Sequence, residues 1–400
     1  MVPDGWKNQS LGDLLSLEYG DGLPQTERTG HGYAVYGSSG VIGEHSDYLI
    51  EGPGIIVGRK GTVGAVEWSQ NNFWPIDTTY YVQPTEELGF RWLYWLLLHS
   101  QLDRLDASTG VPGLNRYEAY ALPVPVPPLP EQRRIAEVLD AADEAIRQTE
   151  RVIAKLREVK RGLLHDLLTR GLDADGNLRD PVAHPEQFKD SPLGQIPREW
   201  ETPTIDDLAV HIGSGATPKG GSKVYQSEGV VFVRSQNVEF EGLILEDVAH
   251  ISDEIHQNMA RSEIFAHDTL INITGASIGR CCPVPEWLGQ ANVNQHVCAI
   301  RLSNPTRMDS IYLSSVLASE VGQHQVEILN AGSNREGLNY TQLRSFIIPW
   351  PSKVEREYIA AILDAHDAHI RTEEAVLAKR RHVKRGLMAD LLTGRVQVCS

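Results

Sequence analysis

A basic pair between two glycines is the clearest candidate for chemistry in this chain. Arg59 and Lys60 stand between Gly58 and Gly61. A loop with this spacing clamps nucleic-acid backbones in KH domains, although the loop alone does not predict that fold. On any fold, an Arg-Lys pair held between glycines is suited to contact a phosphate or a base edge. The pair is therefore a candidate for contact with nucleic acid.

A second motif resembles the nucleophile elbow of serine hydrolases. Gly275, Ser277 and Gly279 have the GxSxG spacing and follow an expected strand. No acid and histidine follow with any specificity, and the corresponding stretch from Gly61 to Gly64 lacks the serine pattern. We interpret the motif as a glycine-rich turn after a strand, and a serine hydrolase stays a remote alternative.

Motifs for metals and nucleotides are incomplete. Asp173, Asp175 and Asn177 imitate the start of a calcium loop, but Leu178 and His184 occupy the positions that need Gly and Glu. The sequence contains no GxxxxGK[ST] loop and no tetrapeptide of the kind that amino-methyltransferases use. His, Asp and Glu are not clustered at metal-ligand spacing. We expect no catalytic residue, no metal and no cofactor in this chain.

The charge of the chain argues against simple binding to nucleic acid. The sequence has 37 basic and 53 acidic residues, a net charge of −16. Residues 1–130 carry a net −8 and residues 200–354 a net −7. Because DNA-binding proteins usually present a basic face, any such binding must come from local clusters or from a basic partner.

Cysteine usage and hydropathy indicate the compartment. The four cysteines form no CxxC pair, and the amino terminus has neither a basic nor an apolar region. No apolar run approaches the roughly 18 residues of a membrane span. We expect a cytoplasmic protein without a membrane segment.

An internal repeat shows which elements must position these residues. Residues 113–171 and 337–395 align without a gap at an offset of 224, and nearly half of the aligned positions are identical. The stretches that precede the two copies do not match each other well. We infer one framework, present twice, that carries two unlike domains.

Both copies predict long helices with apolar residues at heptad spacing. The apolar seam of the first helix comprises Ile135, Leu139, Ile146, Ile153, Leu156, Leu163 and Leu167. The seam of the second comprises Ile359, Leu363, Ile370, Leu377, Leu387 and Leu391, with polar residues at His366, Glu373, Arg380 and Lys384. A seam this polar is poorly suited to pair with a copy of itself, so we expect the two helices to pair with each other.

Helix boundaries are marked by prolines, caps and glycines. Prolines up to Pro130 exclude a helix before Glu131, and Ser352 with Glu355 has the capping-box spacing. Gly171 and Gly394 stand where helices should stop. Each helix also contains one interior glycine, which indicates a tolerated kink or the close approach of the sister helix or a partner. These glycines are Gly162 and Gly386.

The resulting organisation has five parts. They are domain 1 (1–130), spacer helix 1 (131–171), a polar, proline-containing linker (172–198), domain 2 (199–351) and spacer helix 2 (352–395). Short apolar stretches between glycines predict strands at 54–58, 80–82, 230–233 and 270–273, and residues 90–104 and 309–330 predict helices. We expect α+β domains.

This order of parts resembles the specificity subunit of type I restriction–modification systems, over essentially the whole chain. The specific phrases run from Pro127 to Ala136, from Lys160 to Leu164, and from Ser191 to Trp200. Looser phrases are those at 35–40 and 58–61 in domain 1, and at 217–218, 233–238 and 274–279 in domain 2. Residues 351–356 depart from the family's usual Pro-Pro-Leu and Glu-Gln.

The resemblance implies a mechanism. Two globular target-recognition domains, related by a pseudo-twofold repeat, would each read half of a split, asymmetric DNA sequence. The two long helices would form an antiparallel coiled coil that sets the gap. Two methyltransferase subunits would carry S-adenosylmethionine, and two ATP-driven restriction subunits would cleave the DNA. S-adenosylmethionine, ATP and Mg are thus expected in partner subunits, and this chain is expected to be non-catalytic.

Candidate base-reading residues follow from side-chain chemistry. Arg and Lys suit guanine edges, and Asn and Gln suit adenine. In domain 1 the candidates are Tyr36, Ser38, Arg59, Lys60 and Arg116. In domain 2 they are Lys219, Lys223, Arg234, Gln236, Asn237, Asn334 and Arg335. We favour Arg59 and Arg234, and for each candidate an ordinary exposed polar residue is the simpler interpretation.

A non-catalytic scaffold that binds proteins is the alternative function. The acidic charge favours the scaffold, whereas the doubled order of domain and helix favours DNA reading.

Overall fold

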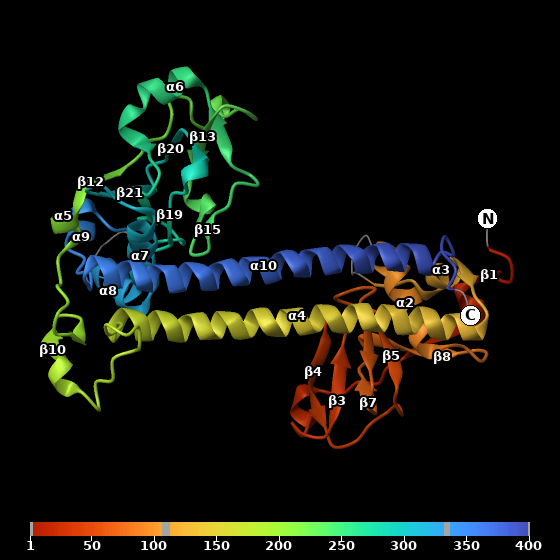
Figure 1. The fold of residues 1–400 in the computed structure, drawn as a ribbon. Helices are drawn as coiled ribbons and strands as arrows, with labels where there is room; N and C mark the ends of the chain where they lie inside the picture. Colours follow the sequence, from red (N-terminus) through yellow and green to blue (C-terminus); the bar gives the residue numbers. More distant parts are fainter. Residues whose placement is uncertain (1–2, 106–112, 332–336, 399–400) are drawn as a thin grey trace. The chain divides into compact units, whose positions relative to one another are not determined.

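The protein consists of two units that each contain parts distant in sequence. The computed structural model describes residues 3–105, 113–331 and 337–398. Unit 1 comprises Met1–Arg151 with Ala375–Ser400, and unit 2 comprises Val152–Glu374. Each unit therefore holds one sheet-containing domain together with part of helix α4 (Leu129–Thr169) and part of helix α10 (Lys353–Leu391). Both helices and the mixed α+β composition agree with the predicted class (Figure 1).

Domain 1 contains two main sheets. The larger is antiparallel, with the strand order β2 (Leu15–Tyr19), β8 (Thr79–Pro84), β5 (Gly54–Gly58), β6 (Val66–Ser69). The smaller has the order β4 (Gly40–His45), β3 (Tyr33–Gly37), β7 (Phe73–Pro75), and β3 runs parallel to β7. Helix α2 (Phe90–His99) buries Trp92 and Trp95 in the core beside the larger sheet.

Domain 2 repeats this strand order with an unlike sequence and with one additional strand, β17, at the edge of its second sheet. Its antiparallel sheet has the order β12 (Ala209–Ser214), β21 (Val297–Leu302), β18 (Thr269–Asn272), β19 (Cys281–Pro283). Its second sheet has the order β16 (Ala249–Ile251), β13 (Val230–Val233), β20 (Ala291–Val293), β17 (Glu263–Ile264), and β13 runs parallel to β20. The strands predicted at 54–58, 80–82 and 230–233 are confirmed, and the strand predicted at 270–273 is shifted by one residue.

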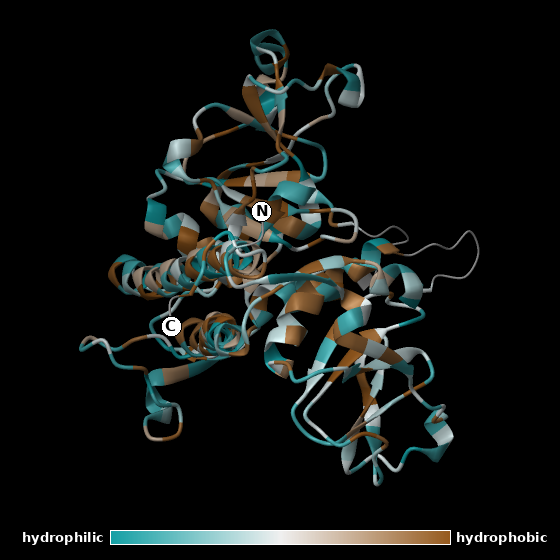
Figure 2. Cartoon of the chain, turned by 90° about the vertical axis from the view of Figure 1, so that its right-hand side faces the viewer, coloured by the Kyte–Doolittle hydropathy of each residue, from teal (hydrophilic) through white to brown (hydrophobic). Residues whose placement is uncertain are grey.

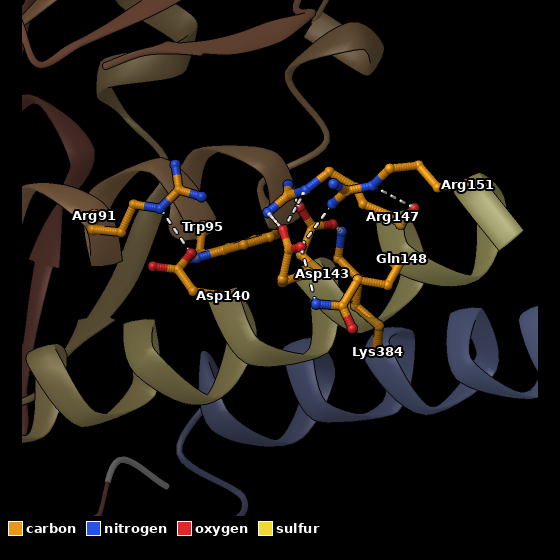
Figure 3. Close-up of polar contacts among 9 residues, drawn as sticks. Arg91, Trp95, Asp140, Asp143, Arg147, Gln148, Arg151 and Lys384 are labelled. Atoms are coloured by element: carbon orange, nitrogen blue, oxygen red, sulfur yellow. Dashed lines mark hydrogen bonds and ion pairs between the residues drawn. The ribbon is translucent and has the colours of Figure 1, made fainter. Parts of the chain in front are cut away.

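The two spacer helices contact each other within each unit. In unit 1 the Lys384 ammonium pairs with the Asp143 carboxylate, close to where α2 also meets α4 (Figure 3). In unit 2 Lys160 Nζ lies 2.6 Å from Asp367 Oδ1. Both the lysines and the aspartates are 224 residues apart, so one ion pair occurs twice with the two helices exchanged. In both units the pairing is antiparallel, which confirms the predicted helix pair.

The outer ends of the helices are buried in the domains. Ile135, Leu139 and Leu391 belong to the core of domain 1, and Leu167, Ile359 and Leu363 to the core of domain 2. Ile146, Ile153 and Ile370 are buried, whereas Leu156, Leu163, Leu377 and Leu387 are half-buried. Both hydrophobic and hydrophilic residues occur on the two helices (Figure 2), as expected for amphipathic helices.

Each domain also has a polar contact to its spacer helix. In unit 1, Asp140 of α4 accepts hydrogen bonds from Arg91 Nε (2.7 Å) and Trp95 Nε1 (2.9 Å), as Figure 3 shows. In unit 2, Arg307 at the start of α7 (Arg307–Ala318) lies 2.7 Å from Asp364 of α10. Asp140 and Asp364 are again 224 residues apart, so equivalent aspartates of the two spacer helices each bind an arginine of the domain in their own unit.

All four predicted helices differ from the structure at their boundaries. The helix predicted at 90–104 ends at His99, and α10 spans Lys353–Leu391 rather than 352–395. Helix α4 begins at Leu129 rather than at residue 131, because Pro130 fits the first turn, where an N–H has no helical acceptor. The helix predicted at 309–330 is broken at Ser319 into α7 and α8 (Glu320–Ala331).

The capping box predicted for α10 forms only in part. Ser352 Oγ accepts the Glu355 N–H at 3.3 Å, but the Glu355 carboxylate bonds to other groups.

The linker is more ordered than its composition indicates. It contains a hairpin of β10 (Phe188–Ser191) and β11 (Gly194–Pro197), and Asp173 Oδ1 closes a turn by accepting two backbone N–H groups.

The interior glycines of both spacer helices face open space. A Cβ added at Gly162 or Gly386 would meet nothing within 4 Å, so the sister helix does not explain them, and a partner protein remains a prediction. Among the described residues, no helix is both long and apolar enough to cross a membrane.

Candidate nucleic-acid interface

Three segments of domain 1 meet at one place on its surface. They are the end of β2, the loop after β5 and the start of helix α3 (Arg116–Tyr120). Lys60 and Gly113 form an isolated β-bridge, and the Arg59 carbonyl oxygen accepts a hydrogen bond from the Leu114 N–H at 2.9 Å. The Arg59 N–H donates to Thr78 O at 2.9 Å. Backbone atoms therefore fasten the loop, and its side chains are left for other contacts.

Two guanidinium groups gather around one tyrosine at this place. The Cζ atoms of Arg59 and Arg116 lie 5.0 and 5.1 Å from the ring centroid of Tyr19, which is 51% exposed. Tyr80, opposite Tyr19 on β8, has its ring 5.1 Å away. Cation–π attraction favours this arrangement because the ring faces are electronegative. The sequence candidates Arg59 and Arg116 are thus neighbours in space.

The charges of this cluster are not neutralised by carboxylates. Among the described residues, the Arg59 guanidinium makes no hydrogen bond or ion pair, and its Nε is buried without a partner. Arg116 donates to Leu17 O (3.4 Å) and to the Tyr117 hydroxyl (3.5 Å), and the latter bond raises the pKa of Arg116. Burial, aided by Tyr19, raises the pKa of Tyr80 to about 12, so its phenol stays neutral. The cluster is therefore cationic at neutral pH.

The other candidates of domain 1 differ in accessibility. Lys60 is exposed, and half-buried Ser38 accepts the Thr62 N–H at 3.4 Å, which places it beside the same loop. Tyr36 is only 7% exposed and packs edge-on against Phe73. It is a core residue, and the structure gives no support to its predicted contact with DNA.

Domain 2 has an equivalent place with different chemistry. Thr274, in the loop after β18, bridges Gly337, and Ile273 O accepts the Leu338 N–H at 2.8 Å. These contacts repeat those of Lys60 and Arg59, and the partners Gly337 and Leu338 lie 224 residues after Gly113 and Leu114. Among the described residues, Tyr340 and Ser214 stand here in place of Arg116 and Tyr19, and the Tyr340 hydroxyl is hydrogen-bonded to Ser214.

The remaining candidates of domain 2 are dispersed. Lys219, Lys223 and Gln236 are exposed. Arg234 donates to Asp247 O at 3.0 Å and lies 5.6 Å from the ring of Tyr225. Asn334 and Arg335 lie outside the described residues.

Asn237 is a structural residue rather than an accessible one. It is 2% exposed, accepts the Arg234 N–H at 3.0 Å and donates to Ile244 O at 2.9 Å. Its amide is therefore used within the chain, and the structure gives no support to its predicted contact with a base.

The GxSxG stretch forms the predicted turn. Ile278 N–H donates to Gly275 O at 3.0 Å, and the Ser277 hydroxyl accepts from Asn272 Nδ2 at 3.1 Å. Within the described part of the chain, no histidine or carboxylate bonds to Ser277, so no general base activates it.

Sequence reasoning missed Tyr19. A signal for it exists, because Gly20 follows Tyr19 as Gly215 follows Ser214, and a Cβ at either glycine would collide with a backbone carbonyl oxygen. These paired glycines mark the same strand end in both domains.

Comparisons with known proteins agree with this architecture. The family model for type I restriction modification DNA specificity domains matches residues 3–158 and 197–379. A putative type I restriction enzyme MjaX specificity subunit from Methanocaldococcus jannaschii is 26% identical over 287 residues, which are 72% of this chain and 62% of that protein. The EcoBI specificity subunit from Escherichia coli is 22% identical over 364 residues, covering 87% of this chain and 75% of that subunit.

A solved structure shares the fold. The crystal structure of a type I S subunit from M. genitalium superimposes with a TM-score of 0.65 at 16% identity, covering 98% of this chain and 96% of that one. The family match spans most of the residues in both domains and both spacer helices. The chain therefore belongs to the type I restriction modification DNA specificity domain family.

Proposed function

We propose that this chain is the DNA-reading specificity subunit of a type I restriction–modification complex and performs no chemistry itself. The observation that carries this proposal is the pair Arg59 and Arg116 around Tyr19. Domain 1 has a net charge of −8, yet these two cations have no carboxylate partner among the residues that the structure describes. Such a site is suited to a phosphate or to the O6 and N7 edge of guanine.

The two domains would read different half-sites of one asymmetric sequence. The four-stranded antiparallel sheets of the two domains have the same strand order, which supports a common way of approaching DNA. Their side chains at the equivalent place differ, since domain 1 presents cations and domain 2 presents hydroxyl groups. Different side chains in the same position read different bases.

Partner subunits would supply catalysis in the cytoplasm of a prokaryotic cell. Two methyltransferase subunits would bind S-adenosylmethionine, and two restriction subunits would use ATP and Mg, so this chain needs no cofactor. The repeated ion pairs Lys160–Asp367 and Lys384–Asp143 support this stoichiometry. Two like surfaces can bind two copies of one partner. A basic partner would also offset the acidic charge of this chain.

Replacing Arg59 tests the proposal. The complex of this chain with its methyltransferase would be expressed in cells without adenine methylation, and methylated adenines would be mapped across the genome. We expect one gapped, asymmetric motif for the natural chain. Arg59→Ala should relax or abolish reading of one half-site, with a loss of about 1–3 kcal/mol of discrimination, because a bidentate contact to guanine contributes that much.

The control is Lys7→Ala, which removes another exposed cation of domain 1 outside the cluster. It should leave the motif unchanged. Both variants should still assemble with the methyltransferase. Methylation of the same full sequence by Arg59→Ala at natural efficiency would contradict the assignment of Arg59, and absence of any motif with the natural chain would favour the scaffold.

A further inference from the structure

Gln295 occupies the place in domain 2 where bases would be read. It is exposed and lies in the short loop between β20 and β21. The next residue, His296, accepts the Ile273 N–H with its carbonyl at 2.9 Å, as Thr78 accepts the Arg59 N–H in domain 1. Gln295 is thus next to the loop that corresponds to the cationic cluster of domain 1.

Side chains from three separate segments orient the Gln295 amide. Thr217 Oγ1 donates to Gln295 Oε1 at 2.5 Å. Gln295 Nε2 lies 2.9 Å from His296 Nε2, and His296 Nδ1 is hydrogen-bonded to Thr274 Oγ1. The His296 backbone is held in turn, because its N–H donates to Asn294 Oδ1 at 3.0 Å.

The proton positions in this chain of bonds follow from the chemistry of each group. An amide nitrogen can only donate, so His296 Nε2 accepts from Gln295. His296 Nδ1 then carries the proton and donates to Thr274. With Thr217 donating to the amide oxygen, the two ends of the amide are distinguished and its rotation is fixed. The amide has two donor hydrogens and two acceptor lone pairs, and these bonds use one of each.

One N–H and one oxygen lone pair of Gln295 are therefore left over at an exposed position. Adenine presents the complementary pair in the major groove, the N6 donor beside the N7 acceptor. A glutamine that only hydrates a surface needs no fixed orientation. Gln257 on helix α6 (Asp253–Asn258) illustrates this, since it is exposed and makes no hydrogen bond through its side chain among the described residues.

We propose that Gln295 reads an adenine in the half-site of domain 2, and that Thr217 and His296 are positioning residues that fix its amide. This inference rests on the proposed function and adds the specificity-determining side chain of the second domain.

The test maps methylated adenines with the natural complex and with variants of this chain. Gln295→Ala should lower discrimination at one position of one half-site by roughly 5- to 150-fold, the factor expected for a bidentate contact. Gln295→Glu should move the preference at that position toward cytosine, because a carboxylate accepts from cytosine N4. Gln257→Ala is the matched control and should leave both half-sites unchanged.

His296→Phe tests the positioning role, since it keeps a ring and removes the acceptor. It should relax the preference at the same position as Gln295→Ala and leave the other half-site intact. A purely structural role would instead lower methylation of all sequences equally.

Three outcomes would overturn the inference. If both Gln295 variants keep their base preferences and the natural chain gives a gapped motif, the inference about Gln295 is overturned and the proposed function stands. An equal loss at all sequences in folded Gln295 variants would assign Gln295 a structural role and also overturn it. Absence of any gapped motif with the natural chain would overturn both this inference and the proposed function.

Discussion

Two equivalent glutamates differ in how many groups they bind. Glu355 lies in the first turn of α10. Its carboxylate accepts hydrogen bonds from Trp200 Nε1 (3.1 Å), Arg179 Nη1 (2.6 Å) and Leu172 N (2.8 Å). Its counterpart Glu131, one repeat earlier, accepts from a tryptophan and from a backbone N–H, at 2.9 and 3.2 Å. Each glutamate therefore fastens a domain to the start of its helix, and Glu355 alone has an arginine partner, with both side chains 10% exposed.

Removing the charge of these glutamates should have unequal effects. Glu355→Gln leaves a nearly buried guanidinium without its anion, and breaking such a pair costs about 3–5 kcal/mol. Glu131→Gln removes no partner and only replaces a charged acceptor by a neutral one. A hydrogen bond to a charged group contributes about 1.5–3 kcal/mol, and only part of that is lost. Urea unfolding of both variants should show the larger loss of free energy of unfolding in Glu355→Gln. Equal losses would mean that Arg179 contributes nothing.

The loss of stability below about pH 4 should depend in part on Asp309. Burial acts to raise the pKa of Asp309, but hydrogen bonds from Thr306 and the Arg356 guanidinium outweigh it and lower that pKa below its usual 3.8. A carboxyl group whose pKa is lower in the folded than in the unfolded protein stabilises the fold at pH values above its unfolded-state pKa. This contribution is lost as the pH falls through the folded-state pKa. Asp309→Asn should therefore lower stability at pH 7 and flatten its decline in acid, as measured by urea unfolding at several pH values.

Single residues were predictable where chemistry alone selects them. Arg59 and Arg116 were identified by type, and the structure places them around one ring. The burial of Tyr36 and Asn237 could not be predicted, because their types suit both a buried and an exposed role and burial depends on contacts distant in sequence. The orientation of the Gln295 amide could not be predicted either, because it depends in part on Thr217 from a distant segment.

At the scale of elements, the spacer helices follow their sequence closely. Heptad spacing predicted both helices and their pairing, because periodic apolar residues must be buried together. The linker hairpin was not predicted, since its short strands carry few apolar residues and owe their order to the buried Phe188 and Ile196. The matching strand order of the two domains was also beyond the sequence, because unlike residues form it.

Replacing the interior glycines with alanine should stabilise the isolated chain. A Cβ at Gly162 or Gly386 meets nothing, and alanine favours a helix over glycine by about 0.8–1 kcal/mol. Gly162→Ala and Gly386→Ala should each raise the free energy of unfolding by roughly that amount. The reverse change at exposed Ala154 of α4 is the control and should lower it.

These glycines also test the partner interpretation. A methyltransferase that approaches the helix backbone there should bind the alanine variants more weakly, although they are more stable. Unchanged binding together with higher stability would leave a tolerated kink as the explanation.

At the scale of the whole molecule, the repeat presents the same residues twice. Both partners of the helix–helix ion pairs recur at the 224-residue offset. The same offset relates Asp140 to Asp364 in the domain attachments and Gly113 to Gly337 in the loop bridges. Each partner surface built from repeated residues is therefore present twice, once in each unit.

Native mass spectrometry with the cognate methyltransferase should detect two copies of that subunit for each copy of this chain. The double variant Lys160→Asp with Asp367→Lys exchanges the ion pair of unit 2 and should keep this stoichiometry. Lys160→Asp alone places two carboxylates together and should favour complexes with one methyltransferase. A single copy bound to the natural chain at saturation would contradict the twofold interpretation.

The bridges Lys60–Gly113 and Thr274–Gly337 have an evolutionary consequence. They are made by main-chain atoms, which form the same bonds whichever side chain is attached. Under the proposed function, substitutions on these loops would therefore change which bases are recognised at little cost to folding. Lineages of this family would then acquire new targets one residue at a time, while the architecture that presents them stays constant.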